Sequence, residues 1–244
     1  MDQINTIKLC ELTKKYKGVP AVNGIEISVK KGEIFAFLGS NGAGKTTTMK
    51  MMTAQTKPTK GKVLFNGVDI WKDSSIRQVA GYVPDIPLLH EGLTPREMLM
   101  FMGGLYGLGK ETIHERTDEL LTKLELSDRG DHLIKEFSLG MKRKVSVACA
   151  MIHKPQILLL DEVTNGLDPR STRTVKDMLF KAAFEDNTTI FITTHILDVV
   201  EEMADRIAII HKGEIKGLGT LSELSNSSEM NSNRLENIFL SLTS

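Results

Sequence analysis

A glycine-rich segment of this 244-residue chain has the residue types and the spacing of a phosphate-binding loop. The pattern G-x-x-x-x-G-K-[ST] is matched by Gly39, Ser40, Asn41, Gly42, Ala43, Gly44, Lys45 and Thr46, and Thr47 follows directly. Glycines allow backbone N–H groups to converge on phosphate oxygens, and the helix expected after them adds the positive end of its dipole. Lys45 supplies a mobile cation, and the Thr46 hydroxyl is suited to Mg²⁺. The segment therefore predicts binding of a nucleoside triphosphate with magnesium.

Two carboxylates follow an apolar run further along the chain. Residues 157–160 are all apolar, and Asp161 and Glu162 come next. This is the end of a predicted strand, where an α/β sheet places its ligand site. In combination with the loop, Asp161 is predicted to hold Mg²⁺ and Glu162 to polarise an attacking water. The pair predicts that the bound nucleotide is hydrolysed.

The elements that must position these residues follow an α/β order. Alternating or continuous apolar runs predict strands, and 3.6-residue periodicity predicts helices. The expected strands are 6–12, 25–29, 34–38, 62–66, 80–84, 157–160, 189–193 and 207–210. The expected helices are 45–54, 94–105, 111–124, 171–184 and 197–203, with a helix-compatible basic run at 142–144. This order predicts a largely parallel, helix-covered sheet into which a helical lobe is inserted.

Two local signals refine this outline. Thr94, Pro95 and Glu97 form a capping box with proline at the first helical position, which marks a helix start. Near the end of the chain, residues 225–233 are rich in Ser and Asn and predict a polar linker. Residues 235–240 then predict a short amphipathic terminal helix.

Composition narrows the classes of function. Lys plus Arg and Asp plus Glu are both 31, so the formal net charge is zero and dedicated nucleic-acid binding is not expected. No apolar run approaches the roughly 20 residues that a membrane-spanning helix needs. The chain has two cysteines, Cys10 and Cys149, and opens without a basic segment followed by an apolar one. These features predict a cytoplasmic protein without disulfides.

With these motifs in place, the chain resembles the ATP-binding subunits of ABC transporters over nearly its whole length. Residues 137–141, Phe-Ser-Leu-Gly-Met, occupy the position of the family signature sequence. The resemblance implies that Ser138 and Gly140 cap the γ-phosphate of ATP bound to a second copy of the chain. Leu139 stands where a glycine is usual and Met141 where glutamine is common, a variant similar to that of the export-type branch.

The resemblance also implies roles for residues that composition and spacing do not single out. It assigns residues 165–168 to the dimer interface and His195 to contact with the γ-phosphate and positioning of Glu162. Tyr16 matches the aromatic residue that stacks on adenine. Asp85 stands where a glutamine usually reaches Mg²⁺ and the attacking water and senses the permease, so Asp85 is expected to serve the metal.

The fold implied by the resemblance is a P-loop NTPase (RecA-like) core with an N-terminal antiparallel β subdomain and an inserted helical subdomain. We expect one ATPase domain over residues 1–225, with a helical signature subdomain at 87–149, followed by the linker and short helix of 226–244. The implied function is ATP hydrolysis in a head-to-tail dimer that drives translocation, in the direction of export, through a separate membrane permease. A homodimer would be sufficient. The chain would then lie on the inner face of the cell membrane.

A soluble ABC ATPase that acts in translation or DNA maintenance is the alternative. The DNA-maintenance types insert a very long coiled coil between the phosphate loop and the signature sequence, and the span from Lys45 to Ser138 is too short for one. The translation types carry two cassettes in one chain. A P-loop GTPase or small-molecule kinase is disfavoured because the chain has no Asn-Lys-x-Asp motif.

Overall fold

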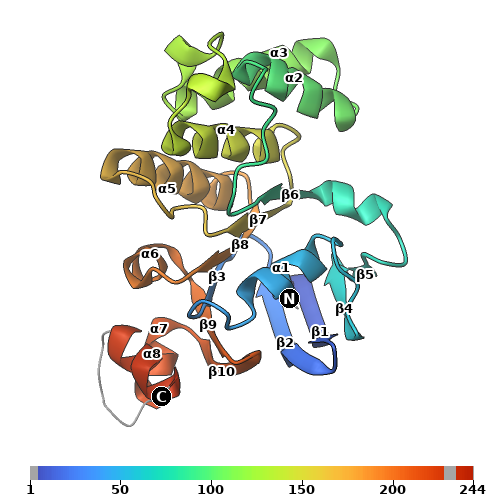
Figure 1. Cartoon of the computed structure of the whole chain (residues 1–244), viewed down its shortest axis with the longest axis vertical. Coiled ribbons are helices and arrows are strands. Elements are labelled where there is room, and N and C mark those ends of the chain that lie inside the picture. Colours follow the sequence, from blue (N-terminus) through green and yellow to red (C-terminus); the bar gives the residue numbers. More distant parts are fainter. Residues whose placement is uncertain (1–4, 228–234, 244) are drawn as a thin grey trace.

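The computed structural model describes residues 5–227 and 235–243, in which two β-sheets pack together and helices cover the larger one (Figure 1). The smaller sheet is antiparallel, with strand order β2-β1-β4-β5. Its strands are β1 (Asn5–Tyr16), β2 (Val19–Lys30), β4 (Lys60–Phe65) and β5 (Val68–Asp69). This arrangement is the N-terminal antiparallel β subdomain that the sequence predicts.

The larger sheet has the order β10-β9-β3-β8-β7-β6 and is parallel except at its β10 edge. Its strands are β3 (Ile34–Leu38), β6 (Ala80–Val83), β7 (Ile157–Asp161), β8 (Thr189–Thr194), β9 (Arg206–His211) and β10 (Glu214–Gly219). Such a sheet, with a phosphate loop after β3, is the core of a P-loop NTPase, so the predicted fold class is confirmed.

Strand β3 separates two hydrophobic cores, which explains its uninterrupted apolar sequence. Ile34, Ala36 and Leu38 belong to the core shared with the helices. Phe35 and Phe37 point the other way, into the core shared with the small sheet. Successive side chains of a strand leave on opposite faces, and both faces here are buried. A strand that is covered on two sides therefore has no polar positions.

Helices cover the other face of the large sheet and form the lobe seen at the top of Figure 1. The lobe contains α2 (Pro95–Leu105), α3 (Lys110–Lys123) and α4 (Leu139–Met151). Helix α1 (Lys45–Met52), which follows the phosphate loop, packs instead in the core shared with the small sheet. The remaining helices are α5 (Pro169–Phe184), α6 (Leu197–Met203), α7 (Leu221–Ser227) and α8 (Leu235–Thr243). The capping box at Thr94 and Glu97 is present and starts α2. None of the helices in the described part of the chain has the length and apolar character needed to cross a lipid bilayer.

The structure corrects the sequence-based interpretation at the C-terminal end. The predicted linker began at Ser225, but residues 225–227 belong to α7. The start of that helix is fixed by Thr220 and Glu223, which exchange side-chain and backbone hydrogen bonds of 3.2 and 2.7 Å in the manner of a capping box. Residues 228–233 of the predicted linker lie outside the described residues. Strand β10, which the sequence did not predict, forms a hairpin with β9.

Candidate functional site

The phosphate loop connects β3 to α1, and close packing explains two of its glycines. A Cβ atom at Gly39 would lie 2.6 Å from the Ile210 carbonyl oxygen. Gly44 has φ 116° and would bring a Cβ atom within 2.7 Å of the Ala21 carbonyl oxygen. Only glycine lacks a Cβ atom and also adopts a positive φ at low cost. The loop can therefore curl tightly enough for its backbone N–H groups to face one point.

Lys45 begins α1 and its side chain is folded back into the loop. Its Nζ donates hydrogen bonds to the carbonyl oxygens of Gly39, at 2.6 Å, and Ser40, at 3.2 Å. The residue is only 5% exposed. A buried ammonium needs hydrogen-bond acceptors or an opposite charge. Glu162 supplies the opposite charge.

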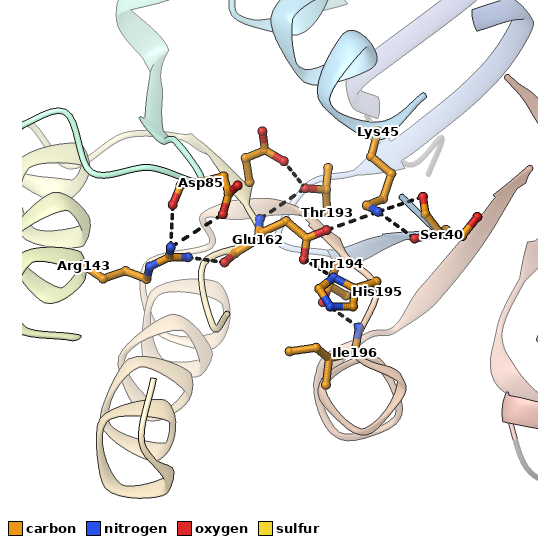
Figure 2. A network of polar contacts seen from close by, with 11 residues as sticks. Ser40, Lys45, Asp85, Arg143, Glu162, Thr193, Thr194, His195 and Ile196 are labelled. Carbon is orange, nitrogen blue, oxygen red and sulfur yellow. Dashed lines mark hydrogen bonds and ion pairs between the residues drawn. The ribbon is translucent and has the colours of Figure 1, made fainter. Parts of the chain in front are cut away.

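Glu162, directly after β7, lies between Lys45 and His195 (Figure 2). Its Oε1 is 3.2 Å from Lys45 Nζ, and its Oε2 is 2.9 Å from His195 Nδ1. Glu162 is buried, whereas the His195 side chain is 41% exposed. The structure thus brings together the three residues that the sequence predicted as catalytic, from the ends of β7 and β8 and the start of α1.

Thr193 on β8 contacts the carboxylate of Asp161 and the backbone of Glu162, and the sequence analysis missed it. In the parallel pairing of β7 with β8, Asp161 stands opposite Thr193. The Thr193 hydroxyl donates to Asp161 Oδ1 at 2.5 Å. The Glu162 N–H donates to the Thr193 carbonyl oxygen at 3.0 Å. A hydroxyl-bearing residue at the carboxyl end of the neighbouring parallel strand was the available signal.

Asp161 fits a metal-binding role by its chemistry. Burial raises the pKa of Asp161 above its ordinary value, the hydrogen bond from Thr193 opposes this shift, and the negative charge of Asp85 adds to it. A carboxylate deprived of water is stabilised when a cation replaces the missing hydration. Carboxylate and hydroxyl oxygens are the ligands that Mg²⁺ prefers. Asp161, Thr46 and Asp85 therefore offer the oxygen groups that would hold a magnesium ion.

Asp85 lies just beyond β6 and is held by Arg143 of α4 (Figure 2). Arg143 Nη2 donates to the Asp85 carbonyl oxygen and lies 3.6 Å from Asp85 Oδ1. Arg143 Nη1 donates to the carbonyl oxygen of Glu162. The sequence suggested only a basic helix for residues 142–144, yet Arg143 and Lys144 are 3% and 6% exposed. Their burial depends on partners distant in sequence, which a local pattern does not reveal.

The phosphate loop, Asp85, Glu162 and His195 line a cleft of about 290 Å³. The predicted residues that line it are Ser40, Asn41, Gly42, Gly44, Lys45, Thr46, Thr47, Asp85, Glu162 and His195, together with Asn165 of the predicted dimer-interface loop. Gly39, Ala43 and Asp161 are buried beside it in the same loop and strand. A larger cavity of about 510 Å³ near Gln156, at the opposite end of β7, contains none of the predicted site residues.

Besides Gly39 and Ala43, three further predicted nucleotide-binding residues do not line this cleft. Tyr16 ends β1, is 47% exposed, and has the ammonium of Lys14 over its ring at 5.3 Å. Ser138 is the exposed N-cap of α4 and accepts a hydrogen bond from the Met141 N–H at 3.3 Å. Gly140 lies next to Leu167, in the predicted dimer-interface loop. Within one chain, the signature sequence thus lies beside that loop and outside the phosphate cleft.

Comparison with known proteins identifies the family. The sequence pattern that defines the ABC transporter family matches residues 22–165, more than half of the chain. The chain belongs to the ABC transporter family. It is an ATP-binding subunit of an ABC transporter and an ATPase, as its relatives indicate.

Two relatives of this ABC protein are drug-related ATP-binding proteins. The bacitracin transport ATP-binding protein BcrA of Bacillus licheniformis is 39% identical over 210 residues, which cover 86% of this chain and 68% of BcrA. The daunorubicin/doxorubicin resistance ATP-binding protein DrrA of Streptomyces peucetius is 37% identical over 230 residues, 94% of this chain and 69% of DrrA.

Solved structures of ABC cassettes have the same fold. An ATP-binding subunit of an ABC transporter superposes with a TM-score of 0.92 at 29% identity, covering 98% of this chain and all of its own. A dimeric ATP-binding cassette in a post-hydrolysis state, bound to ADP and Pi, has a TM-score of 0.80 at 26% identity and covers 88% of this chain and 98% of its own.

Proposed function

We propose that Glu162 is the general base with which this ABC ATPase hydrolyses ATP. The observation that carries the proposal is the position of its carboxylate, 3.2 Å from Lys45 and 2.9 Å from His195 at the phosphate loop. Glu162 would take a proton from water as the water oxygen attacks the γ-phosphorus. The bond between that phosphorus and the bridging oxygen then breaks, and ADP and phosphate leave.

The other residues of the cleft divide between phosphate binding and metal binding. The loop from Gly39 to Thr47 would hold the phosphates through its N–H groups and the Lys45 ammonium. His195 would keep the Glu162 carboxylate aimed and contact the γ-phosphate. Thr46, Asp161 and Asp85 would hold Mg²⁺, which neutralises phosphate charge when bound.

The site is completed by a second copy of the chain in this proposal. Ser138 and Gly140, at the N-terminus of α4, would cap the γ-phosphate bound to the opposite copy. Their position outside the chain's own cleft supports this arrangement, as does the dimeric form of the related cassette bound to ADP and Pi. Because each chain carries both halves of the composite site, a homodimer is sufficient. Tyr16 would stack on the adenine.

The ATPase would drive export through a separate membrane permease and lie on the cytoplasmic face of the cell membrane through it. The names of two relatives, the resistance protein DrrA and the bacitracin transport protein BcrA, support export. In the domain arrangement that we propose, residues 1–225 form the ATPase domain, and residues 87–149 form its helical signature subdomain. The nucleotide core comprises residues 1–86 and 150–225.

Replacing Glu162 with Gln tests the assignment of the base. The amide keeps the size of the side chain but cannot accept the water proton, so turnover should fall by about 100-fold or more while ATP still binds. A dimer that is stable in ATP should then accumulate in size-exclusion chromatography. Glu202→Gln on α6 is the control, since Glu202 pairs with Lys176 away from the cleft. Turnover at the wild-type rate in the Glu162→Gln variant would exclude Glu162 as the base.

A further inference from the structure

Arg143 connects the helical lobe to two segments of the catalytic cleft. It lies on α4, and its guanidinium donates to the carbonyl oxygen of Glu162 and to that of Asp85 (Figure 2). The Asp85 carboxylate lies 3.6 Å from Arg143 Nη2. Arg143 therefore contacts both the proposed base and a proposed metal ligand through a single planar group.

Arg143 is buried, so these contacts replace the hydrogen bonds that its guanidinium would otherwise make to water. Its side chain is 4% exposed, and a buried charge is costly unless it is paired and hydrogen-bonded. Within the described part of the chain, Nε has no hydrogen-bond partner. The two carbonyl oxygens and the Asp85 carboxylate are what hold the guanidinium in place. Planar, forked donors of this kind fix the direction of their acceptors.

The backbone of Glu162 is in a conformation that needs such support. Its φ of 51° is left-handed, which is unfavourable for a residue with a Cβ atom. Such strained residues persist only where the surroundings determine their conformation. The Glu162 carbonyl oxygen accepts from Arg143 and from the Asn165 N–H, at 3.0 Å, and its N–H donates to Thr193. Arg143 is the only one of these partners that belongs to the helical lobe.

We propose that Arg143 is a positioning residue for ATP hydrolysis. It fixes the position of the Glu162 backbone and of Asp85 relative to α4. This inference rests on the proposed role of Glu162 as the base. Since Ser138 is the N-cap of α4, the helix that presents the proposed second anion site also holds the base through Arg143. If the lobe rotated so that Ser138 approached the nucleotide bound to the second copy, Arg143 would then change the orientation of the Glu162 carboxylate.

The test compares turnover with nucleotide affinity. In Arg143→Met the base loses its support, so kcat should fall by about 10- to 100-fold, as for a small misplacement of a reacting group. KM and the Kd for ATP should stay within about threefold, because no phosphate contact is removed. Arg143→Lys should recover part of kcat, since an ammonium can still donate to one of the carbonyl oxygens. A merely structural role would lower Tm without this split between kcat and KM.

Arg116→Met on α3 is a matched control. Arg116 also donates to two backbone carbonyl oxygens, Met151 at 2.8 Å and Ile152 at 3.5 Å, and pairs with Glu119, yet it lies outside the cleft. Its removal should lower Tm and leave kcat within about twofold below the melting range. If Arg143→Met does not fold, Arg143→Gln, which keeps a polar side chain, is measured by the same criteria.

The outcomes separate this inference from the proposed function. If Glu162→Gln abolishes turnover but the Arg143 variants keep wild-type kcat, or lose kcat and ATP affinity equally, the positioning role is wrong and the base stands. If Glu162→Gln keeps turnover, the proposed function itself fails. If Arg143 acts through Glu162, adding Arg143→Met to Glu162→Gln lowers the residual rate by less than about twofold. A full additive loss would show that Arg143 acts independently of the base.

Discussion

The ammonium of Lys45 lies 3.2 Å from the carboxylate of Glu162, and both side chains are almost completely buried. The cation proposed to bind phosphate is thus already paired with the proposed base. Phosphate oxygens that approach Lys45 must compete with Glu162 for it. In the proposed mechanism, phosphate oxygens that succeed would leave the carboxylate with its partner His195, 2.9 Å away in this structure, and available to water. Binding of the nucleotide and release of the base would therefore, in this proposed mechanism, be linked through one ion pair.

Replacing Lys45 with Ala should abolish detectable nucleotide binding. The substitution removes the cation of the phosphate loop and leaves the buried Glu162 carboxylate without its ion-pair partner, so the loop becomes more negative where phosphates bind. Titration with a fluorescent ATP analogue measures the affinity. Lys50→Ala is the control, because Lys50 is exposed on the same helix and lies outside the cleft. Unchanged ATP affinity in the Lys45 variant would contradict the assignment of the loop.

Thr193→Val should raise the Mg²⁺ concentration needed for half-maximal hydrolysis. The variant loses the 2.5 Å hydrogen bond that orients the Asp161 carboxylate, and outer partners of metal ligands are worth about 10- to 100-fold in metal affinity. A titration of ATPase activity with Mg²⁺ measures the change. Thr189→Val is the matched control: Thr189 is buried on the same strand, and its hydroxyl accepts from the Gly32 N–H at 3.1 Å. An equal Mg²⁺ shift in both variants would remove the specific role of Thr193.

The parts of the fold that local sequence determines were predicted closely. Strand Ile34–Leu38 was predicted with its observed bounds, because both of its faces are buried and its sequence is apolar throughout. The phosphate loop and the capping box of α2 depend on residues within a few positions of one another. Strand β10 was missed because its two large apolar residues, Ile215 and Leu218, are three positions apart, so its sequence lacks the two-residue alternation of a strand.

The parts of the site that depend on distant pairing were not predicted. Thr193 became recognisable only when the register of β7 and β8 placed it opposite Asp161. Arg143 reads as one of three consecutive basic residues, which usually lie in solvent, and its buried position follows from carbonyl oxygens on two other segments. Sequence therefore indicated the groups proposed to do the chemistry, and the tertiary structure indicates which groups hold them in place.

His153→Phe should remove part of the loss of stability at acidic pH. His153 stacks on Tyr106 with ring centroids 3.6 Å apart and an interplanar angle of 6°. Burial lowers the pKa of His153 from an ordinary 6.5 to about 4. As the pH falls below 6.5, His153 binds a proton in the unfolded chain, whereas in the folded chain it does so only near pH 4. The contribution of neutral His153 to the free energy of unfolding is therefore complete above pH 6.5 and is lost as the pH falls from 6.5 to about 4.

Phenylalanine keeps the stacking and cannot titrate. The Tm of His153→Phe should therefore rise relative to that of the wild type as the pH falls from about 7 to 5. Scanning calorimetry across this range measures it. His132→Asn is the control, since the side chain of His132 is 46% exposed. Parallel Tm curves for the wild type and His153→Phe would show that His153 is not the group responsible.

Mixing two inactive variants should restore hydrolysis if the site is shared between copies. Lys45→Ala disables the phosphate loop, and Gly140→Asp places a negative charge where the second anion site is proposed. Gly140 tolerates a Cβ atom, with its nearest neighbour, Leu167 Cδ2, at 3.4 Å. An acidic residue in the first turn of α4 is also favourable for the helix, so the variant is expected to fold.

A mixed dimer of these variants has one intact composite site, formed by the loop of the Gly140→Asp chain and the signature sequence of the Lys45→Ala chain. Random pairing makes about half of the dimers mixed, so the mixture should recover about a quarter of the wild-type rate. Mixing Lys45→Ala with Glu162→Gln is the control, because the proposed loop and base belong to the same chain and no intact site forms. A Lys45→Ala and Gly140→Asp mixture no more active than this control would contradict the contribution of a second copy.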